Sequence, residues 1–227
     1  MKEQVTLLTD LHRTIRTRSL DFYLQGKFSS TGKLIGAELL CRWFSPLHGM
    51  VSPGTFIPLA EAHGLDGEIG LMALESACEY IAMMEAEGLS VPMSVNISAN
   101  QLLEPGFASV ALSICDEHVV APQMIEIEIT ESIFIQDESS ALRALTELRN
   151  AGFVLSLDDF GSGFSSLSYL RTFQFDVIKI DRSLAKDIHC STKALSLLSG
   201  LVKMLNSLQY KVLVEGIDNL AYIPLME

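Results

Sequence analysis

The chain has 227 residues, of which 48% are hydrophobic and 19% are charged, so it can form the core of one large domain spanning residues 1–227. Its 28 acidic residues outnumber its 16 basic ones and give a net charge of -12, which argues against nonspecific binding to nucleic-acid polymers or anionic membranes. The sequence contains neither an uninterrupted apolar run of about 20 residues nor the apolar core of a signal peptide. We therefore expect a cytoplasmic protein with no membrane partner.

Cysteine and histidine give no sign of a metal site. The four cysteines stand far apart without a CxxC pair, so we expect buried free thiols rather than disulfides or zinc ligands. The five histidines show no ligand spacing, and each is interpreted as a surface or packing residue.

The apolar pattern predicts strands and helices in alternation. A helix is predicted at residues 5–15, followed by a hairpin of strands at 22–28 and 34–43. A helix that starts at Ser52 is expected to break at Pro58. Further strands are predicted at 93–98, 124–131, 153–159, 176–181 and 211–216, and further helices at 66–87, 107–118, 139–151 and 193–208, with one more beginning at 219. Such alternation, without a linker, indicates an α/β fold with a parallel sheet.

Two of the predicted strands place charges on one face. In the strand at 34–43, Glu38 and Arg42 lie on the same face of an otherwise apolar strand, so their side chains require polar surroundings such as a functional site. The alternative is that the two side chains form an internal ion pair. In the strand at 124–131, isoleucines alternate with Glu126 and Glu128. By itself this second pattern favours a half-exposed edge strand with a solvated acidic face.

The adjacent acids Asp158 and Asp159 follow an apolar run and precede a loop of glycines and serines. Neighbouring side chains on a regular strand point to opposite faces, so these two can share a target only where the backbone turns. Two neighbouring carboxylates repel each other unless a cation lies between them. The alternative is a polar turn in which Asp159 caps the next helix.

Each predicted strand after the first ends near an oxygen ligand or a lysine, and the C-terminal mouth of a closed α/β barrel would bring these residues together. They are Glu38, Asn96, Glu128, Asp158, Lys179 and Glu215. Oxygen donors suit Mg²⁺ or Mn²⁺, and two such ions about 3.5–4 Å apart are suited to in-line displacement at phosphorus. Lys179 can neutralise charge or hold the nucleophile, and Arg42 can clamp a phosphate oxygen.

Six segments resemble, in order, the motifs of the EAL-domain phosphodiesterases, over a region from about residue 22 to residue 218. They are Glu38-Leu39-Leu40-Cys41-Arg42-Trp43, Val95-Asn96-Ile97-Ser98, Glu126-Ile127-Glu128-Ile129-Thr130-Glu131, Asp158-Asp159-Phe160-Gly161-Ser162-Gly163-Phe164-Ser165-Ser166, Lys179-Ile180-Asp181 and Glu215-Gly216-Ile217. The resemblance implies a bacterial enzyme that opens cyclic di-GMP to linear pGpG with two Mg²⁺ or Mn²⁺ ions. It also implies a TIM-like (βα)8 barrel variant whose first strand is antiparallel.

The resemblance implies that Glu38, Asn96, Glu128 and Asp158 are metal ligands and that Asp159 serves the second ion. Glu38 and Asp159 would thereby also be catalytic.

The resemblance implies that Lys179 positions the attacking water and that Glu215 holds metal or water near it. Glu131 would anchor the loop that begins at Asp159, which the family links to dimer contacts, so we expect a homodimer. The residues expected to contact the substrate are Gln25, Leu40, Arg42, Ser98, Asp181 and Asp218.

The chain departs from the family pattern in three places. The name motif reads Glu-Leu-Leu instead of Glu-Ala-Leu, and Asp218 stands where the family usually has glutamate. The family also continues into an eighth strand and a motif with a glutamine, both missing here, so we expect the C-terminal end to be truncated. Without a cyclase, receiver or light-sensing motif, the segment looks like a stand-alone module.

Two other functions remain open. A degenerate relative would bind cyclic di-GMP or a protein partner without cleaving it, but such proteins generally lose acidic ligands or the lysine that this chain keeps. An unrelated barrel lyase could use Lys179 as a base on a carboxylate substrate. That alternative does not explain the Asp158-Asp159 pair and the loop after it.

Overall fold

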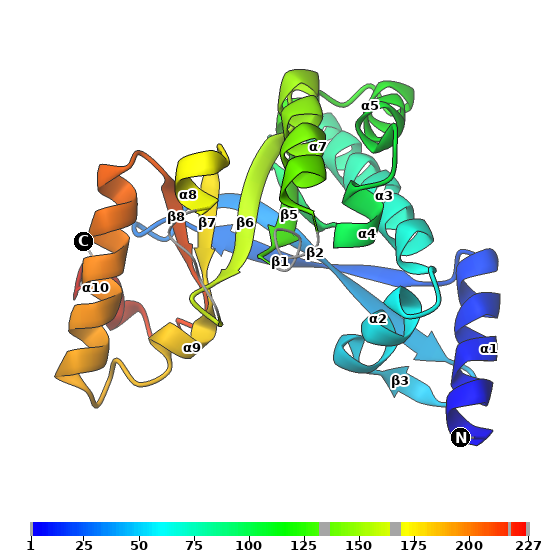
Figure 1. Cartoon of the computed structure of the whole chain (residues 1–227), viewed down its shortest axis with the longest axis horizontal. Coiled ribbons are helices and arrows are strands. Elements are labelled where there is room, and N and C mark those ends of the chain that lie inside the picture. Colours follow the sequence, from blue (N-terminus) through cyan, green and yellow to red (C-terminus); the bar gives the residue numbers. More distant parts are fainter. Residues whose placement is uncertain (1, 132–136, 164–168, 218, 226–227) are drawn as a thin grey trace.

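One curled sheet forms the centre of the computed structural model, which describes residues 2–131, 137–163, 169–217 and 219–225. The strand order is β1-β2-β4-β5-β6-β7-β8, and β3 pairs with β2. The strands are β1 (Asp21–Phe28), β2 (Leu34–Ser45), β3 (Gly49–Val51), β4 (Met93–Asn96), β5 (Ile125–Thr130), β6 (Val154–Phe160), β7 (Val177–Ile180) and β8 (Lys211–Val214). β2 pairs antiparallel with β1 and β3, and the pairs from β2·β4 to β7·β8 are parallel (Figure 1).

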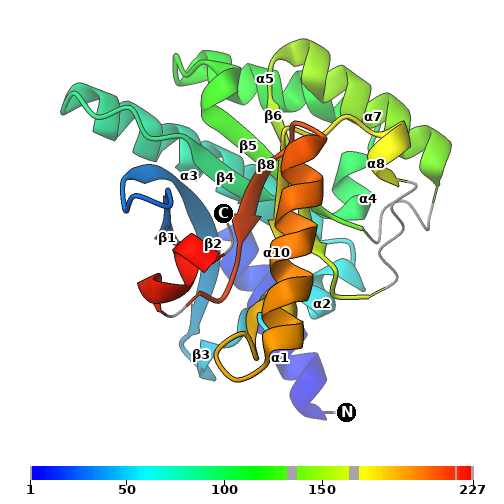
Figure 2. The same ribbon diagram turned by 90° about the vertical axis from the view of Figure 1, so that its left-hand side faces the viewer.

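Helices lie around the outside of the curled sheet, as Figure 2 shows for α3, α5, α7 and α10. Parallel neighbours require crossover connections, and helices make most of them. The helices are α1 (Lys2–Arg16), α2 (Pro53–Glu61), α3 (Asp66–Ala86), α4 (Ala99–Leu102), α5 (Phe107–Glu117), α7 (Glu138–Ala151), α8 (Tyr169–Thr172), α9 (Arg182–Ala185) and α10 (Thr192–Ser207), with 3-10 turns η1 (Pro122–Met124) and η2 (Leu220–Leu225).

The predicted fold class is confirmed: an α/β fold of the TIM-like kind with an antiparallel first strand pair. The sheet is a half-barrel, because in the described residues no strand pairing joins β8 back to β1. The predicted break at Pro58 is wrong, since α2 continues through it to Glu61. The short elements β3 and α4 were not predicted from the sequence.

The position of β5 overturns the edge-strand interpretation of its alternating pattern. β5 lies inside the sheet, between β4 and β6. Its isoleucines belong to the hydrophobic core, while Glu126 and Glu128 point to the opposite, inner face. Glu128 is only 1% exposed, so the acidic face of this strand is buried rather than solvated.

The expectation of free thiols is confirmed, but only two of the four are buried. The Sγ atoms of Cys78 in α3 and Cys115 in α5 lie 4.0 Å apart in the core. Cys41 is half-buried and Cys190 is exposed.

Truncation of Ile127, which is fully buried on the outer face of β5, tests this placement. Ile127→Ala should lower the free energy of unfolding by about 2–5 kcal/mol because it leaves a cavity, and Ile127→Val by about 0.5–1.5 kcal/mol. Urea denaturation followed by circular dichroism measures both changes. Losses below about 0.5 kcal/mol for both variants would instead indicate a surface position.

Candidate active site

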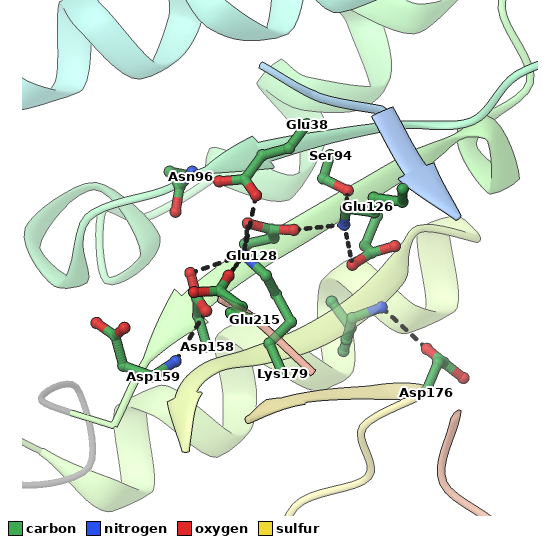
Figure 3. Close-up of polar contacts among 12 residues, drawn as sticks. Glu38, Ser94, Asn96, Glu126, Glu128, Asp158, Asp159, Asp176, Lys179 and Glu215 are labelled. Carbon is green, nitrogen blue, oxygen red and sulfur yellow. Dashed lines mark hydrogen bonds and ion pairs between the residues drawn. The ribbon is translucent and has the colours of Figure 1, made fainter. Parts of the chain in front are cut away.

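The ammonium group of Lys179 in β7 is the centre of a buried ion cluster (Figure 3). Its Nζ lies 2.7 Å from Oε2 of Glu128, 3.0 Å from Oδ2 of Asp158, and 3.1 Å from both Oε2 of Glu38 and Oε1 of Glu215. The lysine is 1% exposed, so this charge depends on its carboxylate partners for stabilisation.

Different strands deliver these carboxylates to one end of the half-barrel. Glu38, Glu128 and Asp158 lie on β2, β5 and β6, and Glu215 directly follows β8. Asn96 is the last residue of β4, and its Nδ2 donates a hydrogen bond of 2.9 Å to Oε1 of Glu38. The amide orientation leaves the Asn96 carbonyl oxygen as a potential ligand.

The turn predicted at the acid pair lies inside β6 and is made by Asp159 itself. Asp159 has a φ of 57°, the left-handed conformation that aspartate tolerates better than most residues. The pairing of β6 with β7 is irregular between Leu157 and Phe160, so the strand bulges there. The backbone N–H of Asp159 donates to Oδ1 of Asp158 at 2.8 Å. The bulge lets both neighbouring carboxylates face one site.

The carboxylates form two groups that share Asp158. One group is Glu38, Glu128 and Asp158, and the other is Asp158, Asp159 and Glu215; in each, one oxygen per residue lies within 4.8 Å of the others. These five carboxylates carry more negative charge than Lys179 can neutralise. Because all the donors are oxygens, the cluster fits two neighbouring Mg²⁺ or Mn²⁺ ions better than zinc.

Burial raises the pKa of Asp158 to about 6, even though Lys179 acts to lower it. Burial also raises the pKa of Glu38, where Glu128 adds repulsion, and of Asp159, where Asp181 does.

The pKa of Glu128 moves the other way. Burial alone would raise it, but the ammonium groups of Lys179 and Lys27 hold it below its usual value. The pKa of Lys179 is in turn raised by Glu128, Asp158 and Glu38, against the effect of burial.

The expected substrate contacts Gln25, Leu40 and Arg42 lie on the β1–β2 hairpin beside the cluster. Gln25 is exposed and pairs in register with Glu38. Leu40 pairs in register with Tyr23, whose ring lies 5.8 Å from the Arg42 guanidinium carbon. The Arg42 Nη1 donates to the Cys41 carbonyl oxygen at 3.0 Å.

The other expected contacts have local roles in the structure. The Ser98 hydroxyl donates to Asp66 Oδ2 at 2.5 Å and accepts from the Gln101 N–H as the N-cap of α4. Asp181 caps α9 by accepting from the Ser183 N–H at 2.9 Å. Glu131 is half-buried directly after β5.

Two predicted features fall partly or wholly outside the described residues: Asp218, and the part of the loop after Asp159 that spans residues 164–168. Sequence reasoning missed Lys27 on β1, whose ammonium group donates a hydrogen bond to Glu128. The available signal was a lysine two positions after Gln25, which places both on one face of β1.

The model of the EAL domain family matches residues 8–226. The bifunctional diguanylate cyclase/cyclic di-GMP phosphodiesterase MucR of Pseudomonas aeruginosa is 33% identical over 219 residues, which are 96% of this chain and 32% of MucR. The cyclic di-GMP phosphodiesterase PA2567 of the same organism is 34% identical over 216 residues, 94% of this chain and 37% of that protein. This chain therefore belongs to the EAL domain family.

The solved MucR phosphodiesterase in complex with c-di-GMP superposes with a TM-score of 0.89 at 32% identity, covering 97% of this chain and 90% of that one. The chain spans about a third of the length of the curated relatives it matches. In the described part of the chain, no helix combines the length and apolar character needed to cross a membrane.

The raised pKa of Asp158 predicts how pH governs the response to a divalent cation. A divalent cation at this cluster would bind the ionised carboxylate, so Mn²⁺ should raise the Tm of the metal-free protein by several degrees at about pH 7.5 and lose most of this effect near pH 5, where most Asp158 side chains carry a proton. Differential scanning fluorimetry with and without Mn²⁺ measures the difference. An equal Tm increase at both pH values would contradict the assignment of the cation to this cluster.

Proposed function

We propose that this protein is a cyclic di-GMP-specific phosphodiesterase that hydrolyses its substrate to linear pGpG with two Mg²⁺ or Mn²⁺ ions. The observation that supports the proposal most is the paired carboxylate groups that share Asp158 and surround Lys179. Membership in the EAL domain family and the names of two relatives point to the same substrate.

In the proposed reaction, a water oxygen attacks one phosphorus atom of the cyclic dinucleotide while the bond from that phosphorus to the ribose 3′ oxygen breaks. The water loses a proton and the leaving oxygen gains one, which yields a linear product with a terminal 5′-phosphate. Divalent cations held by Glu38, Asn96, Glu128, Asp158 and Asp159 would supply charge stabilisation and a more acidic water.

The chain's own residues would hold the reacting groups in place. In the structure the three N–H groups of Lys179 donate to Glu38, Glu128 and Asp158. Cations that bound these carboxylates would release an N–H group of Lys179, which could then orient the water, with Glu215 beside it. Arg42 lies on the same hairpin as Glu38 and could contact a phosphate oxygen through its guanidinium group. Gln25 and Leu40 would border the substrate next to it.

The family resemblance extends the proposal to assembly and location. We propose a homodimer that works in the cytoplasm, with the loop after Asp159 near the dimer contact. Sedimentation of the purified protein measures the oligomeric state.

Replacement of one ligand tests the activity. Glu38→Gln keeps the size of the side chain but removes its charge, so it should lower kcat/KM for cyclic di-GMP by at least about 100-fold, more than the loss of an outer partner of a metal ligand usually causes. Chromatography of the products with Mg²⁺ and with Mn²⁺ measures the conversion to pGpG.

The matched control is Glu147→Gln, which removes the same charge from an exposed position on α7 and should leave the activity unchanged. Full turnover by Glu38→Gln, or by the wild type in excess chelator, would refute the metal-dependent mechanism. Calorimetric binding of cyclic di-GMP without any product after long incubation with Mn²⁺ would instead identify a binding module.

A further inference from the structure

A second level of polar residues lies next to the candidate metal ligands, toward the N-terminal ends of β4 and β5, and Figure 3 labels two of them, Ser94 and Glu126. Ser94 on β4 and Glu126 on β5 pair in register, as do Asn96 and Glu128 two residues further along the same strands. Ser94 and Glu126 therefore lie about 7 Å from Asn96 and Glu128 along the strands, toward the N-terminal end of the parallel sheet. Lys27 reaches this level from β1.

Lys27 connects the two levels through its ammonium group. Nζ lies 2.6 Å from Oε1 of Glu128 and 3.0 Å from Oε1 of Glu126, and it donates a further hydrogen bond to the Ser94 hydroxyl. The side chains of Lys27 and Glu128 are 9% and 0% exposed. Charge-assisted contacts of this kind in a buried setting are strong and directional.

The two oxygens of Glu128 are thus held by different lysines. Oε1 accepts a hydrogen bond from Lys27. Oε2 accepts one from Lys179, which also contacts Glu38 and Asp158, the two residues grouped with Glu128 as candidate metal ligands. With Oε1 engaged by Lys27, only Oε2 is left to face a cation at the cluster. If the Lys27 contact were absent, the carboxylate could rotate, and the neighbouring Glu126 would repel it.

We propose that Lys27 is a positioning residue that fixes the rotation of Glu128 and directs Oε2 toward the cation. This inference rests on the proposed role of Glu128 as a metal ligand. Outer contacts that orient a ligand commonly change metal affinity by about 10–100-fold. Lys27 would act through Glu128 and is neither one of the proposed metal ligands nor one of the proposed substrate contacts.

Charge and positioning predict opposite effects of removing Lys27. By charge alone, loss of a neighbouring ammonium group would make the cluster more negative and strengthen the binding of a divalent cation. Loss of positioning would weaken binding. The direction of the change in Mn²⁺ affinity therefore separates the two.

The experiment measures Mn²⁺ binding to the metal-free full chain at about pH 8, where carboxylates such as Asp158 are ionised. Electron paramagnetic resonance of free Mn²⁺ gives the Kd, and near-ultraviolet circular dichroism confirms folding. We expect Lys27→Met to raise the Kd by about 10–100-fold and Lys27→Arg, which keeps the charge, to raise it less. An unchanged or lower Kd for Lys27→Met would overturn the proposal.

Two further variants exclude a purely structural role, in which Lys27 only neutralises Glu126. Glu126→Gln keeps the contact between Lys27 and Glu128 and should stay within about threefold of the wild-type Kd. The double variant Lys27→Met/Glu126→Gln removes the pair together, so it should fold even where the single variant does not, and it should still bind Mn²⁺ weakly. Recovery of the wild-type Kd in the double variant would overturn the proposal.

The readout also separates this inference from the proposed activity. Mn²⁺ binding is measured without substrate. A wild-type protein that binds Mn²⁺ but does not cleave cyclic di-GMP would contradict the proposed function, and the Kd values of the Lys27 variants would still test the positioning role. Saturation of the wild type with Mn²⁺ and no change in any Lys27 variant would contradict the positioning role alone.

Discussion

The structure depends on how its half-barrel accommodates charge in the interior. Lys179 has 1% of its surface exposed and contacts four carboxylates, of which Glu128 and Asp158 are buried and would be costly to bury without a neighbouring ammonium group. The outward faces of the same strands are apolar and pack in the core under the helices. Alternation along each strand therefore divides the sheet into one face that stabilises the fold and one that gathers ionic groups.

This division explains why most of the architecture could be predicted. Helix periodicity, strand alternation and glycine turns are local signals, and the predicted elements are found with shifts of a few residues at their ends. The convergence of Glu38, Glu128, Asp158, Lys179 and Glu215 was also predictable, because parallel strands bring their C-terminal ends to one edge. The roles of these residues stay predictions.

Contacts between distant parts of the chain could not be predicted. The alternation in β5 indicates two different faces but not which of them is solvated, and its internal position depends on β4 and β6. The contact of Lys27 with Glu128 joins residues 101 positions apart, and that of Ser98 with Asp66 depends on how α3 packs beside β4. The bulge at Asp159 was expected as a turn, but its location inside β6 depends on pairing with β7.

The bulge in β6 also restricts which amino acids can occupy position 159. Its left-handed backbone disfavours branched side chains and suits glycine, asparagine and aspartate. Of these three, only aspartate also places a carboxylate against Asp158 and Glu215. The backbone conformation and the proposed role as a metal ligand thus favour aspartate independently. If one of the two requirements were lost, the other would still disfavour most substitutions. Few single substitutions at position 159 would therefore be tolerated.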